Sequence, residues 1–253
     1  MAALARFGLA VRGFLYLVIG WLAVQIARGH RSQEANQRGA LATVADHSFG
    51  EALLWTLGFG FAAYSLWRLS EAAFGTAAEG RKTAPRLQSL VRGIVYAGFA
   101  TTTFVFIAGT SQQTQTQQQV TATAKLMKHG YGRWLVGLVG VIVIVIGLYM
   151  VVEGLRRKFE KQLRMNELHG LTRTLVVRLG MIGTTARGVV FALAGALVLE
   201  AAVNYDASKS TGLDGALRTL ANRAYGPWIL GVLAVGLIAF GVYGLAAARF
   251  AKT

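Results

Sequence analysis

Ionisable side chains inside apolar segments are the residues of this sequence most able to do chemistry. Arg12, Arg92 and Arg187 each lie about one turn inside the start of an apolar run, and Glu71 and Glu153 lie near the ends of two other runs. An ionised side chain costs roughly 3 kcal/mol in a membrane interior on insertion scales, so such residues are usually paired or functional. We take these five residues as the candidate site.

The spacing of these charges predicts ion pairs. If consecutive apolar runs form antiparallel helical hairpins, Glu71 lies level with Arg12 and Glu153 lies level with Arg92. We therefore predict an Arg12–Glu71 pair and an Arg92–Glu153 pair. Arg68 lies one turn before Glu71 and could share its carboxylate, because residues three apart are neighbours on a helix.

Arg187 differs from the other two arginines, because Ala247 occupies the position at which its hairpin would carry a glutamate. One interpretation is that its guanidinium extends to lipid headgroups and fixes the orientation of the helix. A second is that all three arginines face a common axis and attract anions, as rings of charge do in ion pathways.

No set of residues predicts catalysis. The chain has no cysteine, no Ser/His/Asp set, no metal-binding histidine pair on one helix, and no phosphate or dinucleotide motif. His47 and His129 occupy equivalent positions, but the third equivalent is Arg223, which argues against a shared metal site. We expect no catalytic residue, no cofactor and no metal, and hence no enzyme.

The elements that position the charges are apolar helices. Apolar residues make up 54% of the 253 residues and charged residues only 15%. A helix of about 20 residues spans the ~30 Å hydrocarbon core of a bilayer. The sequence therefore predicts an all-α membrane protein with six transmembrane helices, at about 7–27, 52–74, 87–109, 134–155, 179–202 and 228–250.

A repeated pattern organises these spans. The motif Arg12-Gly13-Phe14-Leu15-Tyr16 recurs from Arg92 and from Arg187, and an aromatic-Gly pair follows each motif at Gly50, Gly132 and Gly226. Each unit holds two spans, so the three units insert in the same sense. We predict three parallel two-helix repeats, 1–80, 81–165 and 166–253, in a pseudo-threefold bundle.

The segments between spans also carry predictions. Each repeat is expected to carry a short amphipathic helix at the membrane surface before its second span, for example Gly39–Ala45 and Gly215–Ala221. The low-complexity tract Ser111–Gln119 is expected to be a flexible loop rather than a site. Glycines concentrate on the second span of each repeat, which favours close helix packing there and places those spans at the inner contacts.

The repeat resembles a bacterial membrane family known as domain of unknown function 1206. Its members look like tandem two-helix units with an Arg-Gly-x-x-Tyr/Phe start to the first helix and an aromatic-Gly start to the second. The resemblance covers nearly the whole chain in three copies, and the third departs at Ala247. It implies the fold and a membrane location, and it implies no activity.

Charge predicts the orientation and the partners. Lys and Arg total 26 against 11 Asp and Glu. Nine of the basic residues fall on the side of the loops after the first, third and fifth spans, and the remaining 17 fall on the other side. Cytoplasmic loops carry the excess, so both termini are predicted in the cytoplasm of a bacterial inner membrane. We expect anionic headgroups at that face, with a membrane-protein partner as a further possibility and no nucleic acid.

Two functions remain open at this level. The first is a structural or accessory membrane protein that acts through contacts with lipids or with other membrane proteins. The second is a small channel or transporter for an ion or small anion, based on the repeated intramembrane arginines. A polar central cavity would favour the second function and a dry interior would disfavour it.

Overall fold

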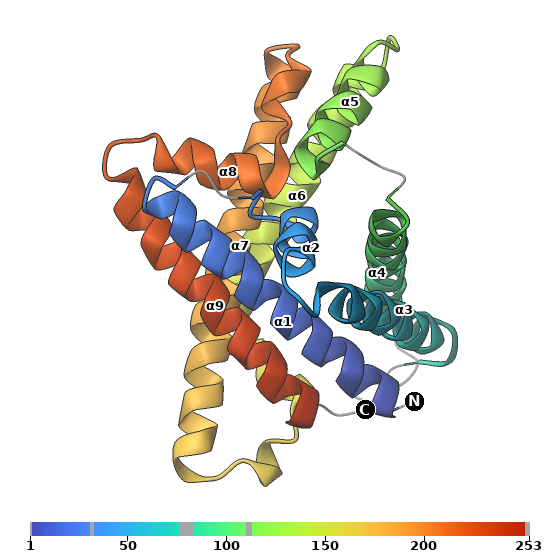
Figure 1. Cartoon of the computed structure of the whole chain (residues 1–253), viewed down its shortest axis with the longest axis vertical. Coiled ribbons are helices and arrows are strands. Elements are labelled where there is room, and N and C mark those ends of the chain that lie inside the picture. The colour runs from blue at the N-terminus through green and yellow to red at the C-terminus, as the bar shows by residue number, and fades with distance from the viewer. Residues whose placement is uncertain (1, 31–32, 76–82, 110–112, 251–253) are drawn as a thin grey trace.

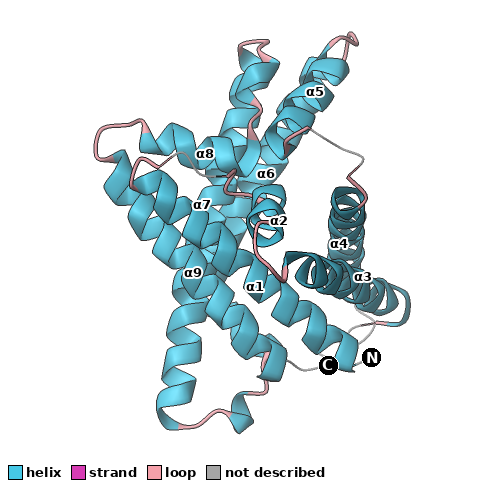
Figure 2. Ribbon diagram, in the orientation of Figure 1, coloured by secondary structure: helices cyan, strands magenta, loops and turns pink. Residues whose placement is uncertain are grey.

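The structure, a computed structural model, describes residues 2–30, 33–75, 83–109 and 113–250, and these form nine α-helices and three short 3-10 helices without a strand (Figures 1 and 2). The α-helices are α1 (Ala2–Ala27), α2 (Gln37–Ala45), α3 (Gly50–Phe74), α4 (Thr83–Ile107), α5 (Gln115–Met127), α6 (Gly132–Leu155), α7 (Gly170–Val203), α8 (Gly212–Ala221) and α9 (Gly226–Phe250). The 3-10 helices are Lys158–Gln162, Met165–Glu167 and Ala207–Lys209.

All six predicted spans are long helices, and five of them are long and apolar enough to cross a membrane. These five are α1, α4, α6, α7 and α9. The sixth helix, α3, has 25 residues, which is sufficient length, but it also carries Glu51, Arg68 and Glu71. Arg68 and Glu71 are buried within the protein, so these two charged side chains face neighbouring helices.

Two segments differ from what the sequence suggests. The helix that contains the predicted span 179–202 begins earlier, at Gly170, because the basic segment with Arg173 and Arg178 is also helical and makes α7 34 residues long. The tract predicted as a flexible loop is largely helical. Thr114 caps α5 with a reciprocal hydrogen-bond pair to Gln117, the arrangement that starts helices at Thr-x-x-Gln. Residues 111–112 of that tract lie outside the described residues.

The structure confirms a short helix before the second long helix of every repeat. α2 contains Gly39–Ala45 and α8 contains Gly215–Ala221. α5 occupies the equivalent place in the second repeat, so each repeat consists of a long helix, a short helix and a second long helix. We call α2, α5 and α8 the collar, because they lie together at one end of the long helices.

The most extensive helix contacts join successive repeats rather than the two long helices of one repeat. α3 packs on α4, α6 packs on α7, and α9 returns to pack on α1, as Figure 1 shows for the neighbouring blue and red helices. In each case the second long helix of one repeat lies against the first long helix of the next. Contacts of α1 with α3 and of α7 with α9 join these three pairs, so the six long helices follow one another in space in the order α4, α3, α1, α9, α7 and α6, without extensive contact between α4 and α6.

Glycines at the crossing points permit these contacts. An added Cβ at Gly13 would lie 2.8 Å from the carbonyl oxygen of Gly241, and one at Gly188 would lie 2.7 Å from the carbonyl oxygen of Gly147. At the third crossing, Ser65 donates a hydrogen bond to the carbonyl oxygen of Gly93, 2.8 Å away. The predicted close packing of second-span glycines is thus present, but their partners are the first spans of the next repeat. In lipid the hydrophobic effect does not drive helices together, so their association depends on van der Waals contact, which small residues allow at short range.

Candidate functional site

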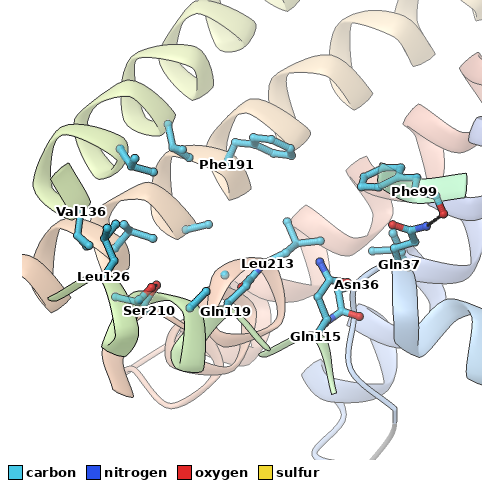
Figure 3. Close-up of a pocket in the computed structure, with 18 of the residues that line it drawn as sticks. Asn36, Gln37, Phe99, Gln115, Gln119, Leu126, Val136, Phe191, Ser210 and Leu213 are labelled. Atoms are coloured by element: carbon cyan, nitrogen blue, oxygen red, sulfur yellow. Dashed lines mark hydrogen bonds between the residues drawn. The ribbon is translucent and has the colours of Figure 1, made fainter. Parts of the chain in front are cut away.

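A cavity of about 450 Å³ lies where the three repeats meet, and all three contribute to its wall (Figure 3). Ile19, Phe99 and Ala194 line it, and each of them follows the arginine of its repeat by seven residues. Equivalent faces of α1, α4 and α7 therefore point to one space. This lining corrects the expectation that the second spans form the inner contacts, since of those only α6 contributes.

A second set of equivalent residues lines the collar side of the cavity. Gln37, Gln119 and Leu213 each precede the glycine of the aromatic-Gly pair by 13 residues, and all three face the cavity. Figure 3 shows Gln119 and Leu213 across the space from Phe191. Gln37 also donates to the carbonyl oxygen of Phe99 at 3.0 Å, so one collar side chain is tied to a long helix.

The collar is closed by hydrogen bonds between repeats. The Glu34 carboxylate accepts from the backbone N–H of Gln115 at 3.1 Å, which joins the start of α2 to the start of α5. Thr123 on α5 donates to the Ser210 hydroxyl, 2.9 Å away, just before α8. Asp214 on α8 accepts from the backbone N–H of Ala35 at 2.8 Å, which returns to α2. These links hold the mouth of the cavity in a fixed shape.

Glu34 is ionised in this collar. Partial burial acts to raise the pKa of its carboxyl group, but hydrogen bonds from Asn36, Thr116 and Thr114 outweigh burial and hold the pKa below 4.5. A carboxylate at the N-terminus of α5 also interacts favourably with the helix dipole. The mouth is otherwise lined by amides and hydroxyls, so it presents neutral hydrogen-bonding groups.

Aromatic side chains close the opposite end of the cavity. Tyr16 and Phe191 line it, and the Tyr16 ring packs edge-on against Phe240 with the centroids 4.8 Å apart. The Arg187 guanidinium carbon lies 5.0 Å from the ring centroids of all three of these aromatic residues. The floor of the cavity is therefore an aromatic layer backed by a cation.

Arg12 lies against the same layer. Its guanidinium carbon is 4.9 Å from the Phe240 centroid, so the guanidinium groups of Arg12 and Arg187 share one ring. The two cations are no more than about 10 Å apart, at which distance unit charges repel by roughly 2 kcal/mol at an effective dielectric constant of 20. The Nε atoms of both are buried and have no hydrogen-bond partner among the described residues.

The predicted Arg12–Glu71 pair does not form. The Glu71 carboxylate instead accepts from Arg68 at 2.7 Å and from the Ser89 hydroxyl at 3.1 Å. Arg68 donates further to the Tyr64 hydroxyl at 2.9 Å and 3.0 Å. The reason is that Arg68 and Glu71 are neighbours on α3, whereas the Arg12 side chain packs on Phe240 of α9. The expectation that Arg68 could share Glu71 is confirmed, with Arg68 as its ion-pair partner.

The predicted Arg92–Glu153 pair is also absent from the ion pairs of the described residues. Glu153 lies on α6, close enough to act on Arg92 electrostatically but without a hydrogen bond. The reason is the divergence of the second repeat, in which α4 packs mainly on α3 and α6 mainly on α7. Within the described residues, Arg12, Arg92 and Arg187 thus all lack a carboxylate partner.

The histidines weighed for a metal serve their own helices. Nδ1 of His47 lies 2.8 Å from the carbonyl oxygen of Thr43, and Nδ1 of His129 lies 3.2 Å from that of Lys125. Both contacts are made four residues back, at the end of a collar helix. In the described part of the chain, no group of three or more potential ligand residues could hold a metal ion.

Comparison with known proteins identifies the repeat. The family described as "Domain of Unknown Function (DUF1206)" matches the chain three times, over residues 7–75, 87–157 and 182–251. The chain belongs to the DUF1206 family. The chain is similar to a Bacillus subtilis (strain 168) protein described as "Uncharacterized protein YxxB", which is 28% identical over 243 residues, covering 95% of this chain and 87% of that protein. No solved structure matches.

The contacts between successive repeats explain the residues of the DUF1206 motif in this chain. The arginine of Arg-Gly-x-x-Tyr/Phe faces the interior, the glycine admits the second span of the preceding repeat, and the aromatic residue packs on that span. Tyr96 meets Tyr64 at 4.4 Å, and Tyr16 meets Phe240 at 4.8 Å. The third equivalent of Tyr64 and Phe240 is Ile146.

Sequence reasoning missed several residues of the central cavity and of the aromatic layer behind it. Gln115 and Gln119 were hidden in the low-complexity tract, although the Thr-x-x-Gln capping signal was present there. Phe240 was missed because its partners Tyr16 and Arg187 lie on other repeats. Ile146 is 44% exposed, whereas Tyr64 is 0% and Phe240 is 3% exposed, so the second repeat leaves uncovered a position that the other two repeats bury.

Proposed function

We propose that this chain is a multi-pass protein of the bacterial cytoplasmic membrane that binds an amphiphilic lipid at the centre of its three repeats. Its role is then accessory rather than catalytic. The observation that carries the proposal is the central cavity, which combines an apolar wall with a mouth of neutral polar groups.

The proposal includes six spans around a pseudo-threefold axis, with both termini in the cytoplasm. Two sets of repeat-equivalent residues facing one cavity support the axis. The burial of Arg68 and Glu71 supports α3 as the sixth span, because its charges are satisfied inside the protein. The excess of basic residues at the end opposite the collar supports the orientation.

The lining defines the chemistry of the ligand. Val139, Val143 and Val198 contribute apolar surface along the helices, while Asn36 and Gln115 contribute amides at the collar. The volume falls within the ~300–1,000 Å³ range of small-molecule pockets. An apolar chain with an uncharged, hydrogen-bonding head fits both parts.

The channel or transporter hypothesis is less well supported by this geometry. An ion crossing the collar half would meet valine and phenylalanine side chains and then the aromatic floor, which do not replace water of hydration. Beyond the cavity, the exposed basic residues Arg156, Arg157 and Lys158 are suited to anionic headgroups at the cytoplasmic face. A membrane-protein partner remains part of the accessory role, and nucleic acid does not.

Filling the cavity tests the proposal. Ala194→Phe would place a ring in the cavity, whereas the control Val235→Phe enlarges a side chain that is 61% exposed on α9. Native mass spectrometry of the purified proteins would count the lipid molecules that remain bound. We expect wild type and Val235→Phe to retain one lipid that Ala194→Phe loses. No retained lipid in wild type, or equal retention in Ala194→Phe, would contradict the proposal.

A further inference from the structure

We propose that the guanidinium groups of Arg12 and Arg187, with Arg92 beside them, form a binding site for a phosphate group. The site lies on the side of the aromatic floor away from the collar cavity. It is separate from the proposed lipid cavity and does not depend on it.

The first argument is unbalanced charge. Glu71 is already bound by Arg68, so it is not free to neutralise a second cation. Arg12, Arg68 and Arg92 are close enough to act on one another electrostatically. Like charges in a low-dielectric interior are costly unless an anion joins them.

The second argument is unused hydrogen-bonding capacity. The Nε atoms of Arg12 and Arg187 are buried without a partner in the described part of the chain. A buried donor left unpaired is unfavourable, and native proteins pair nearly all of them. The rest of both side chains is only partly buried, so a small ligand can reach them.

The third argument is the shape of the site. Both guanidinium groups pack against the Phe240 ring, and the guanidinium carbons of Arg12 and Arg187 lie 4.9 Å and 5.0 Å from its centroid. The buried residues Tyr16 and Tyr96 lie within electrostatic range of Arg12, and their hydroxyls donate no hydrogen bond to any described residue. Two planar forks and two hydroxyls suit a tetrahedral oxyanion, because each fork can bind two of its oxygens. A carboxylate has only two oxygens, which both forks would have to share, whereas a phosphate can offer each fork two oxygens with fewer of them shared.

The phosphate can come from two sources, a free anion or the headgroup of an anionic lipid. Arg12 lies 15 residues before the end of α1 at the collar, or roughly 22 Å along the helix. That depth places the site in the membrane half opposite the collar, within reach of the aqueous phase and of headgroups on that side. The experiment therefore has one arm for each source.

The test measures Tm. One arm titrates inorganic phosphate into detergent-solubilised protein against chloride of equal ionic strength. The other compares nanodiscs of phosphatidylcholine with nanodiscs that also contain phosphatidylglycerol. We expect wild-type Tm to rise in at least one arm, and the apparent affinity to fall about ten- to a hundredfold in Arg12→Gln and Arg187→Gln, the loss expected for one charge-assisted hydrogen bond.

The control is Arg223→Gln, which removes one positive charge from an exposed loop at the collar end and should keep the wild-type response. A wild-type Tm that responds in neither arm would overturn the proposal, as would a full response in both glutamine variants. If a glutamine variant does not fold, Arg187→Lys decides, because it keeps the charge but loses the planar fork. Wild-type affinity in that variant would also overturn the proposal.

Discussion

At the scale of single residues, the Arg-Gly motif separates into two roles on neighbouring positions. The arginine carries charge to the interior, and the glycine determines how closely the next helix approaches. Gly188 shows the second role most clearly, because a Cβ there would lie 2.7 Å from both the Gly147 carbonyl oxygen and the Val151 nitrogen. Those are backbone atoms, which cannot move aside as a flexible side chain can.

Gly188→Ala is therefore expected to destabilise the protein. Forcing a methyl group into this crossing should cost about 1–3 kcal/mol and lower Tm. The matched control is Gly98→Ala, since Gly98 lies on α4 with no atom near the added Cβ, and alanine favours a helix over glycine by up to about 1 kcal/mol. Differential scanning fluorimetry of both variants would measure the contrast. Equal losses of Tm would show that the crossing does not depend on glycine.

The sequence was sufficient to find Arg12, Arg92 and Arg187 but not their surroundings. Periodicity places a residue on its own helix and at its own depth. It does not show which of five other helices lies opposite, and here Arg12 meets Phe240 from the far end of the chain. The local Arg68–Glu71 pair, three residues apart, was the part of the charge network that the sequence could anticipate.

At the scale of elements, the collar links the repeats through polar contacts between short helices. The sequence predicted α2 and α8 from their matching residues. It predicted a short helix in every repeat but did not place α5, because the repeated glutamines and threonines of Ser111–Gln119 suggested a flexible loop rather than the capping pattern at Thr114. Composition obscured a signal that depends on the order of the residues.

Glu34 makes collar stability dependent on pH. Its pKa is held below 4.5 in the folded protein by the hydrogen bonds from α5 and Asn36. A lowered folded-state pKa stabilises the protein above the ordinary value, and that contribution is lost as pH falls through the folded-state pKa. Glu34→Gln should therefore lower Tm at pH 7, and the difference from wild type should shrink as pH falls below 4.5.

The control for this titration is Glu51→Gln, since Glu51 is an exposed carboxylate in the first turn of α3. Its effect on Tm should be smaller at neutral pH. A Glu34→Gln difference that stays constant from pH 7 to well below 4.5 would show that the ionised carboxylate does not hold the collar.

At the scale of the whole molecule, three two-helix repeats combine by contacts between repeats. The hairpins predicted from the sequence identified the long helices but assigned their strongest contacts to the wrong partners. Similar repeats carry similar faces, so the sequence alone cannot distinguish packing within a repeat from packing between successive repeats. The return of α9 to α1 joins the first and third repeats and brings Tyr16, Phe240 and Arg187 together.

The packing of the last long helix on the first is tested most directly by a disulfide between them. The chain has no cysteine, and a Cβ at Gly20 would lie 2.9 Å from the backbone nitrogen of Ile238. With Gly20→Cys and Ile238→Cys combined in membranes, mild oxidation should give an intramolecular cross-link, seen as a shifted band that a reductant reverses. Gly20→Cys with Val232→Cys, on the exposed face of α9, should give none. A first pair that stays reduced although Gly20→Cys alone keeps a Tm close to that of the wild type, or that forms only dimers between chains, would contradict the contact between α1 and α9.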